Sequence, residues 1–267
     1  MSERIKEVFD RLRRSGEKAL VAFVTAGDPD LEATEEIIAE MERRGVDIVE
    51  LGVPFSDPMA DGPTIQASSE RALRRGTTLR DVLGLVARVR KKSGIPIVLF
   101  GYYNPVFVYG PANFARHAAR AGVDGVLVVD LPPEEADELT TELDRVGIDF
   151  ISLLAPTSDE RRIALVASRA SGFIYYVSLT GVTGARKKLS TAVSGAVRRI
   201  KAVTDLPVCV GFGVSTPEQA GAVGRSADGV VVGSAIIDII AACGEREEIA
   251  GRVGDFVGEL KAALAGR

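Results

Sequence analysis

RRGVDIVELG (43–52), RAGVDGVLVVD (120–130) and RVGIDFISLL (145–154) share one pattern, in which arginine and glycine precede an aspartate and then an apolar run. The glycine is typical of a helix end, and the apolar run is typical of a strand. One helix-to-strand turn is therefore used three times, which favours a quasi-repeating α/β barrel. An open doubly wound sheet is the alternative, but the G-x-G-x-x-G fingerprint that it needs is absent from TAGDPDLEA (25–33).

Short apolar runs alternate with helical periodicity along the whole chain, which predicts parallel strands joined by helices. The expected strands are 19–27, 47–55, 96–103, 125–131, 149–156, 172–179, 207–214 and 229–235. The expected helices include 31–45, 78–94, 114–122 and 160–170. With 267 residues, 46% of them apolar, we expect a single (β/α)8 TIM barrel domain over residues 1–267, with an extra helix in the first 18 residues.

Composition and charge exclude several classes of function. The net charge is −4 without a basic stripe, so DNA and RNA are not expected as partners. The opening segment 1–16 is charged and has no apolar core, which predicts neither a signal peptide nor a membrane span and suggests a cytoplasmic protein. Cys209, Cys243 and the single histidine, His117, lack metal-ligand spacing, so no metal site is expected.

An acid interrupts the second expected strand. Glu50 lies in DIVELGVPF (47–55), where a purely structural strand would have another apolar residue. Strand alternation puts Ile48, Glu50 and Gly52 on one face, and if this face points inward, Glu50 stands in the mouth of the barrel. A desolvated glutamate suits proton transfer near neutral pH. The alternative is a buried structural glutamate, for which no cation lies nearby in the sequence.

The segment that follows, SDPMADGPTIQ (56–66), predicts a long loop that becomes helical from about Thr64. Loops at the carboxyl ends of barrel strands commonly carry the reacting residues. For Asp57 a turn or capping role is an equal alternative. Asp61, in the middle of the loop and directly before Gly62, is the better candidate for a functional acid.

Glycine-rich segments after the last three expected strands predict a phosphate site. Backbone N–H groups after strands seven and eight of such barrels commonly bind phosphate, and glycine lets the backbone approach closely. The candidate residues are Gly181, Gly184, Gly211, Phe212, Gly213, Gly233 and Ser234. No lysine falls at an expected strand end, which disfavours Schiff-base chemistry. Carboxylates helped by Tyr102, Tyr103 or Tyr175 remain as the acid–base groups.

ELGVPFSDPMADGPTIQ (50–66) resembles, nearly letter for letter, the signature of the tryptophan synthase alpha subunit family. Further matches extend the resemblance over nearly the whole chain. They are AFVTAGDPD (22–30), YYNPVFVYG (102–110), DLPPEE (130–135), SLLAPTS (152–158), YYVSLTGVTGA (175–185), GFGVS (211–215) and VGSA (232–235). Leu179 departs from the family, in which many members have arginine at this position.

The resemblance implies retro-aldol cleavage of indole-3-glycerol phosphate to indole and glyceraldehyde 3-phosphate. It implies that Glu50 is the general acid–base residue, that Asp61 faces the indole nitrogen, and that Thr183 closes over Asp61. Protonation of indole C3 makes a cationic leaving group, which a carboxylate near N1 stabilises. The residues that resemble the wall of the substrate pocket are Phe23, Phe100, Tyr102 and Tyr175. Core packing is the alternative for the two phenylalanines.

The same family works with a beta subunit that holds pyridoxal phosphate and joins indole to serine. The resemblance therefore implies an alpha2beta2 heterotetramer, no cofactor in this chain, and weak activity without the partner. The positions that resemble partner-facing ones are Pro54, Asp57, Asn104 and Pro132. Two alternatives stay open: a phosphate-binding barrel isomerase, which would share the glycine loops, and a non-catalytic activator of a partner.

Overall fold

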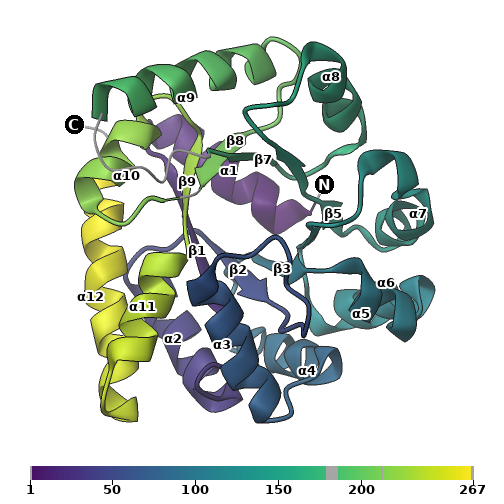
Figure 1. Cartoon of the computed structure of the whole chain (residues 1–267), viewed down its shortest axis with the longest axis vertical. Coiled ribbons are helices and arrows are strands. Elements are labelled where there is room, and N and C mark those ends of the chain that lie inside the picture. The colour runs from purple at the N-terminus through teal and green to yellow at the C-terminus, as the bar shows by residue number, and fades with distance from the viewer. Residues whose placement is uncertain (1, 179–185, 212, 266–267) are drawn as a thin grey trace.

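The computed structural model describes residues 2–178, 186–211 and 213–265. In this part of the chain, nine parallel strands follow one another around a closed sheet (Figure 1). They are β1 Ala19–Thr25, β2 Ile48–Gly52, β3 Ile97–Gly101, β4 Gly125–Val128, β5 Asp149–Phe150, β6 Ser152–Leu154, β7 Ile174–Val177, β8 Val208–Gly211 and β9 Gly229–Val232. Their order is β5-β4-β3-β2-β1-β9-β8-β7-β6.

The two ends of this order belong to one stretch of chain, which closes the barrel. β5 pairs with β4, β6 pairs with β7, and only Ile151 separates β5 from β6. The Ile151 N–H donates to the Val126 carbonyl at 2.9 Å, so the stretch is held to β4 as well as to β7. The barrel therefore has eight strand positions, and the prediction of a (β/α)8 barrel is confirmed.

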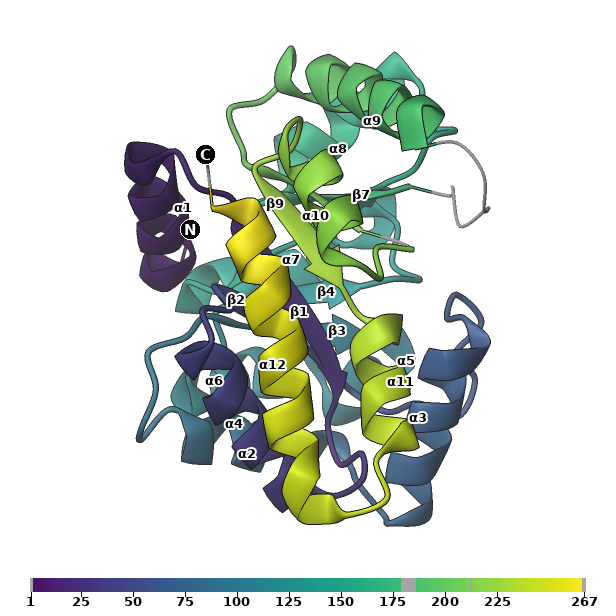
Figure 2. The ribbon, with the colours of Figure 1, turned by 90° about the vertical axis from the view of Figure 1, so that its left-hand side faces the viewer.

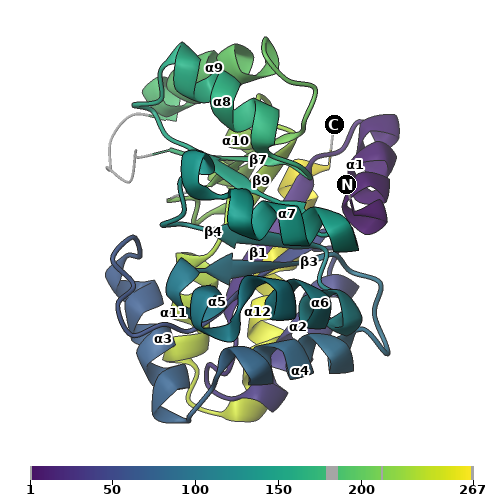
Figure 3. The same ribbon diagram turned by 90° about the vertical axis from the view of Figure 1, so that its right-hand side faces the viewer.

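Helices surround the barrel, and one closes its amino-terminal end. They are α1 Glu3–Ser15, α2 Leu31–Arg43, α3 Pro63–Arg74, α4 Leu79–Val89, α5 Tyr103–Tyr109, α6 Pro111–Ala121, η1 Pro133–Glu135, α7 Asp137–Val146, α8 Glu160–Arg169, α9 Arg186–Lys201, α10 Pro217–Gly224, α11 Ser234–Ala242 and α12 Arg246–Leu264. Ile5, Phe9 and Leu12 of α1 are buried against the interior of the barrel. Figures 2 and 3 show α1 on the opposite side of the barrel from α3. The prediction of an extra helix in the first 18 residues is confirmed.

The expected strand at 96–103 is too long. β3 ends at Gly101, and Tyr103 already begins α5. The run YYNPVFV looks strand-like because tyrosine, valine and phenylalanine favour strands. The Asp130 carboxylate accepts the Tyr103 N–H at 2.8 Å, and Pro105 lies in the first helical turn, where its missing N–H costs nothing.

Strand alternation sorts the core into two layers. Ile48 packs inside the barrel with Val21 and Val98, whereas Val49 and Leu51 pack outward under the helices. Glu50 therefore belongs to the inward face, next to Phe23 of β1 and Val98 of β3 in the strand register. The predicted orientation of this acid is confirmed.

The repeated helix-to-strand turn has a common structure. Gly45, Gly122 and Gly147 have φ between 73° and 94°, a backbone conformation that favours glycine. Two residues later comes a buried aspartate that binds a neighbouring strand or the amino-terminal segment. Asp47 accepts the Leu20 N–H, and Asp124 accepts the Ile97 N–H, each at 2.9 Å. The aspartates thus satisfy backbone donors at the barrel bottom.

Replacement of Asp124 by asparagine is expected to lower the free energy of unfolding by about 3 kcal/mol. The carboxylate is 1% exposed and accepts from Ser2, Arg4, Ile97 and Arg90 at 2.9–3.0 Å. Asparagine has an NH2 group in place of one carboxylate oxygen. Its N–H donors would then face the two donors whose hydrogen bonds this oxygen now accepts. Urea unfolding measures the loss, with Asp144→Asn, an exposed aspartate on α7, as the control. Equal stability of the two variants would contradict the prediction.

Candidate active site

The two predicted acids lie toward the carboxyl ends of the strands. Glu50 is 1% exposed on β2, and its Oε1 is buried without a hydrogen-bond partner among the described residues. Burial raises the pKa of the Glu50 carboxyl to about 8. No cation pairs with it in this part of the structure. A glutamate in this state is protonated at neutral pH and can act as a general acid.

Asp61 lies in the loop between β2 and α3, and Tyr102, which directly follows β3, binds it. The Tyr102 hydroxyl donates to Asp61 Oδ2 at 3.0 Å, and the Asp61 carbonyl accepts from Gln66 Nε2 at 2.8 Å. Burial raises the pKa of the Asp61 carboxyl, and the Tyr102 hydroxyl opposes this rise. The acid is therefore half-buried beside a donor that favours its charged form.

Tyr175 lies near both acids. Its pKa is raised well above the usual value by burial, with further contributions from the charges of Glu50, Cys209 and Asp61. Tyr175 pairs in register with Leu153 on one side and Cys209 on the other, so its side chain points into the barrel with Glu50. Glu50 and Tyr175 therefore share the inward face of the barrel, and Asp61 is near enough to contribute to the pKa of Tyr175.

Two pairs of aromatic rings lie near the acids. The rings of Phe23 and Phe100 meet edge to face, with centroids 5.3 Å apart and an interplanar angle of 80°. Phe55 packs beside Tyr102 at 5.2 Å. Phe23 is buried and Phe100 is partly exposed, so the second ring is available to a ligand while the first also packs in the core. A flat aromatic substrate suits such a wall.

The glycine segments of β8 and β9 lie at the same end. Gly213 has φ of 76°, which favours glycine, and a Cβ on Gly211 would lie 2.3 Å from the Tyr175 hydroxyl. Gly233 directly precedes α11, and the first residue of α11, Ser234, is exposed. The free N–H groups at a helix start suit an anion. Five residues that the sequence analysis named lie outside the described residues: Leu179, Gly181, Thr183, Gly184 and Phe212.

The residues predicted to face a partner have different exposures. Asp57 and Asn104 are exposed, Pro132 is partly exposed, and Pro54 is buried. The sequence reasoning missed a group of exposed apolar side chains nearby. Met59 is 84%, Phe107 58% and Val108 77% exposed. The run NPVFVYG gave a signal, because its apolar residues exceed what one buried face of a short helix can use.

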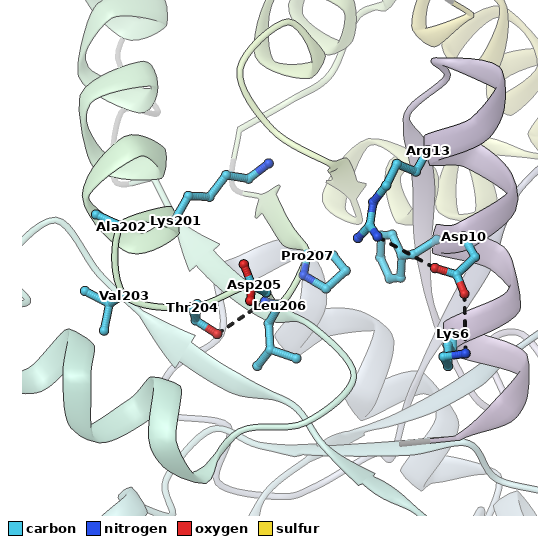
Figure 4. Close-up of a pocket in the computed structure, with 11 residues that line it drawn as sticks. Lys6, Asp10, Arg13, Lys201, Ala202, Val203, Thr204, Asp205, Leu206 and Pro207 are labelled. Carbon is cyan, nitrogen blue, oxygen red and sulfur yellow. Dashed lines mark hydrogen bonds and ion pairs between the residues drawn. The ribbon is translucent and has the colours of Figure 1, made fainter.

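A hollow of about 670 Å³ lies at the opposite end of the barrel, between α1 and the connection from α9 to β8 (Figure 4). Its cationic side chains are already paired. Lys6 and Arg13 bind Asp10 at 3.5 and 3.8 Å, and Lys201 binds Asp228 at 2.6 Å. Amino-terminal ends of barrel strands serve stability rather than chemistry. The candidate site is therefore at the carboxyl ends, with Glu50 and Asp61.

Comparison with known proteins identifies the family. The family model described as "Tryptophan synthase alpha chain" matches residues 9–265. The chain belongs to the tryptophan synthase alpha chain family. A relative of this name from Geobacter sp. (strain M21) is 58% identical over 97% of this chain and 96% of its own, and one from Geobacter sulfurreducens is 57% identical over 98% of both. The crystal structure of tryptophan synthase subunit alpha from Legionella pneumophila str. Paris has a TM-score of 0.91 and 39% identity, over 99% of this chain and 98% of that one.

Family membership gives the reaction. A tryptophan synthase alpha chain is a lyase that cleaves indole-3-glycerol phosphate, works with a beta subunit and needs no cofactor of its own, since pyridoxal phosphate belongs to the beta subunit. This decides against the isomerase and the non-catalytic activator. None of the helices within the described residues is both long enough and apolar enough to cross a bilayer.

Proposed function

We propose that Glu50 and Asp61 together carry the cleavage of indole-3-glycerol phosphate in this chain. The observation that supports this most directly is the buried Glu50 carboxyl, whose Oε1 has no hydrogen-bond partner among the described residues. Burial raises its pKa to about 8, which keeps it protonated at neutral pH. A protonated Glu50 can donate its proton to C3 of the indole ring. The ring then carries a positive charge that is shared with N1.

Asp61 is proposed to accept the indole N–H and to stabilise this charge. Its half-buried carboxylate has one oxygen bound by the Tyr102 hydroxyl, which leaves the other oxygen for a ligand. A preorganised carboxylate in a desolvated site stabilises a developing positive charge far better than water does. The cationic ring is then a good leaving group.

The newly formed Glu50 carboxylate completes the reaction. It takes the proton of the glycerol hydroxyl next to the bond that breaks, the O–H electron pair forms the aldehyde C=O, and the C–C pair returns to the indole ring. The products are indole and glyceraldehyde 3-phosphate, and Glu50 is protonated again. One buried glutamate can therefore serve both proton steps, provided that it reaches the hydroxyl directly or through a water.

The phosphate end of the substrate is proposed to bind at the start of α11. Gly213 has a φ of 76°, Gly233 leads into α11, and Ser234 offers a hydroxyl and the first free N–H of the helix. The space beside Gly211 is taken by the Tyr175 hydroxyl, so Gly211 would contribute through its backbone alone. The macrodipole of α11 adds to the attraction of an anion. This binding would hold the indole end against Phe100 and the two acids.

The test is indole formation from indole-3-glycerol phosphate by the purified chain, with and without a tryptophan synthase beta subunit. We expect slow release of indole and an equal amount of glyceraldehyde 3-phosphate from the chain alone, and faster release with the partner. No indole under either condition would overturn the proposal. Equal rates with and without the partner would contradict its partner dependence.

We further propose an alpha2beta2 assembly in which the beta subunit covers a partner surface formed by Asp57, Met59, Asn104, Phe107 and Val108. Three of these side chains are exposed and apolar on neighbouring segments, which suits a protein interface.

We also propose that residues 1–267 form one domain, because Lys261 of α12 binds Asp47 at 2.6 Å and Ser2 binds Asp149. We propose a cytoplasmic location for the chain, because its substrate is phosphorylated.

Replacement of Val108 by aspartate is expected to weaken binding of the beta subunit about 30-fold, equivalent to about 2 kcal/mol for a buried interface residue. Val108 is 77% exposed, so the change leaves the fold and the basal rate intact. Titration of the partner against indole release measures the affinity. Val203→Asp, at an exposed valine by the opposite end of the barrel, is the matched control. Equal affinities of the two variants would remove Val108 from the interface.

A further inference from the structure

Tyr102 occupies a fixed position between β3 and α5. Its side chain is 4% exposed, and its ring packs against Phe55 with centroids 5.2 Å apart. The next residue is anchored as well, because the Tyr103 N–H donates to Asp130 Oδ1 at 2.8 Å. The Tyr102 hydroxyl is thus presented from a short connection whose ring is packed and whose next residue is hydrogen-bonded.

This hydroxyl makes two hydrogen bonds to the loop that carries the acid. It donates to Asp61 Oδ2 and accepts the Ala60 N–H, each at 3.0 Å. Gln66 of α3 also holds the loop, because its Nε2 donates to the carbonyls of Pro58 and Asp61 at 3.4 and 2.8 Å. These bonds reach the backbone only, whereas the Tyr102 hydroxyl binds both the backbone at Ala60 and the carboxylate of Asp61.

We propose that Tyr102 is a positioning residue for Asp61, which sets the direction of its carboxylate and favours its ionised form. This inference rests on the proposed function, in which Asp61 accepts the indole N–H. It gives Tyr102 a different role from the pocket wall that the family resemblance implied. A side chain in the wall would touch substrate, whereas a positioning side chain acts through the carboxylate that it holds.

The direction of the hydrogen bond supports this role. Burial and the neighbouring Asp61 raise the pKa of the Tyr102 hydroxyl, so it stays protonated and can only donate to the carboxylate. Donation to a carboxylate stabilises the charged form and lowers its pKa, against the effect of burial. A hydrogen bond to an ionised acceptor is about twice as strong as a neutral one. Loss of the hydroxyl should therefore change both the geometry of Asp61 and its ionisation.

The test is Tyr102→Phe, which removes the hydroxyl and keeps the ring. We expect kcat/KM for indole release to fall about 10-fold, mainly in kcat, because Asp61 acts on charge that develops in the transition state. We also expect the acidic limb of the pH profile to move to higher pH, since Asp61 loses the donor that lowers its pKa. Tyr109→Phe is the matched control, because it removes the hydroxyl that bonds His117 at 2.8 Å.

A double-mutant cycle separates positioning from packing. In the Asp61→Asn background, Tyr102→Phe is expected to change the rate less than twofold. A full 10-fold loss in that background would overturn the inference, as would an unshifted acidic limb in the single variant. If Tyr102→Phe had wild-type kinetics while Asp61→Asn was strongly impaired, the inference would also be overturned, and the proposed function would stay intact. Full activity of Asp61→Asn would instead overturn the proposed function. Thermal unfolding checks that both tyrosine variants fold.

Discussion

Replacement of Glu50 by glutamine is expected to lower kcat for indole release at least about 1,000-fold, the loss of a general acid that serves two proton steps. Glutamine keeps the size and polarity of the side chain but can neither donate nor remove the required proton. Single-turnover measurement of indole formation gives the rate. Retention of more than a tenth of wild-type activity would show that another group moves the proton.

The same substitution is expected to stabilise the folded chain near neutral pH. In the unfolded chain the carboxyl has its usual pKa of 4.5, whereas in the folded chain it is about 8. Between these values the folded state binds one more proton, so the stability of the wild type falls as pH rises through this window. At pH 7 we expect the free energy of unfolding of Glu50→Gln to exceed that of the wild type by about 3 kcal/mol. This difference nears its full size by pH 8 and vanishes below pH 4.5.

Urea unfolding at pH 5, 7 and 9 measures this effect. The variant should gain stability over the wild type mainly between pH 5 and pH 7, with a smaller further gain at pH 9. A constant difference across the three pH values would mean that the folded-state pKa of Glu50 is ordinary. Asp144→Asn on α7 serves as the control, because it also replaces a carboxyl with an amide but lies in solvent.

Replacement of Asp61 by asparagine is expected to reduce kcat/KM about 300-fold, which is about 3 kcal/mol of transition-state stabilisation. The amide can still contact the indole N–H through its oxygen, but it carries no charge to balance the cationic ring. The loss should appear in kcat more than in KM. The variant should remain as stable as the wild type, because Asp61 is only half-buried and sits in a loop.

A result in which KM alone rises would mean that Asp61 binds substrate and transition state equally, and it would leave Asp61 with no part in the chemistry. Asp144→Asn is again the control for the charge change. The expected loss is smaller than for Glu50→Gln, because the neutral amide keeps part of the contact that the carboxylate makes.

The prediction of fold from sequence succeeded where short-range patterns carry the information. The R-x-G-[VI]-D repeat predicted helix-to-strand turns, and each glycine and aspartate of the repeat has a defined task in the backbone. Strand alternation correctly predicted that Glu50 points into the barrel. The prediction failed at 96–103, where a tyrosine- and valine-rich segment begins α5, because a capping carboxylate from another loop outweighs the strand preference.

The candidate site was predicted as two acids, but not as an arrangement. Nothing in the sequence indicates that Tyr102 holds Asp61, since 41 residues separate them and the contact arises where two adjacent strands end. The exposed Met59, Phe107 and Val108 were also missed, because the exposure of a side chain in a loop or a short helix depends on which neighbours cover it.

The sequence by itself determined the (β/α)8 barrel, the helix over its amino-terminal end and the position of an acid inside the second strand. These follow from periodicity and turn chemistry, which act between residues close together in the chain. Only the tertiary structure decided which donor meets which acid and how far each carboxyl is buried. These properties depend on groups brought together from distant segments, because desolvation and hydrogen bonding act over a few ångströms of space whatever the separation along the chain.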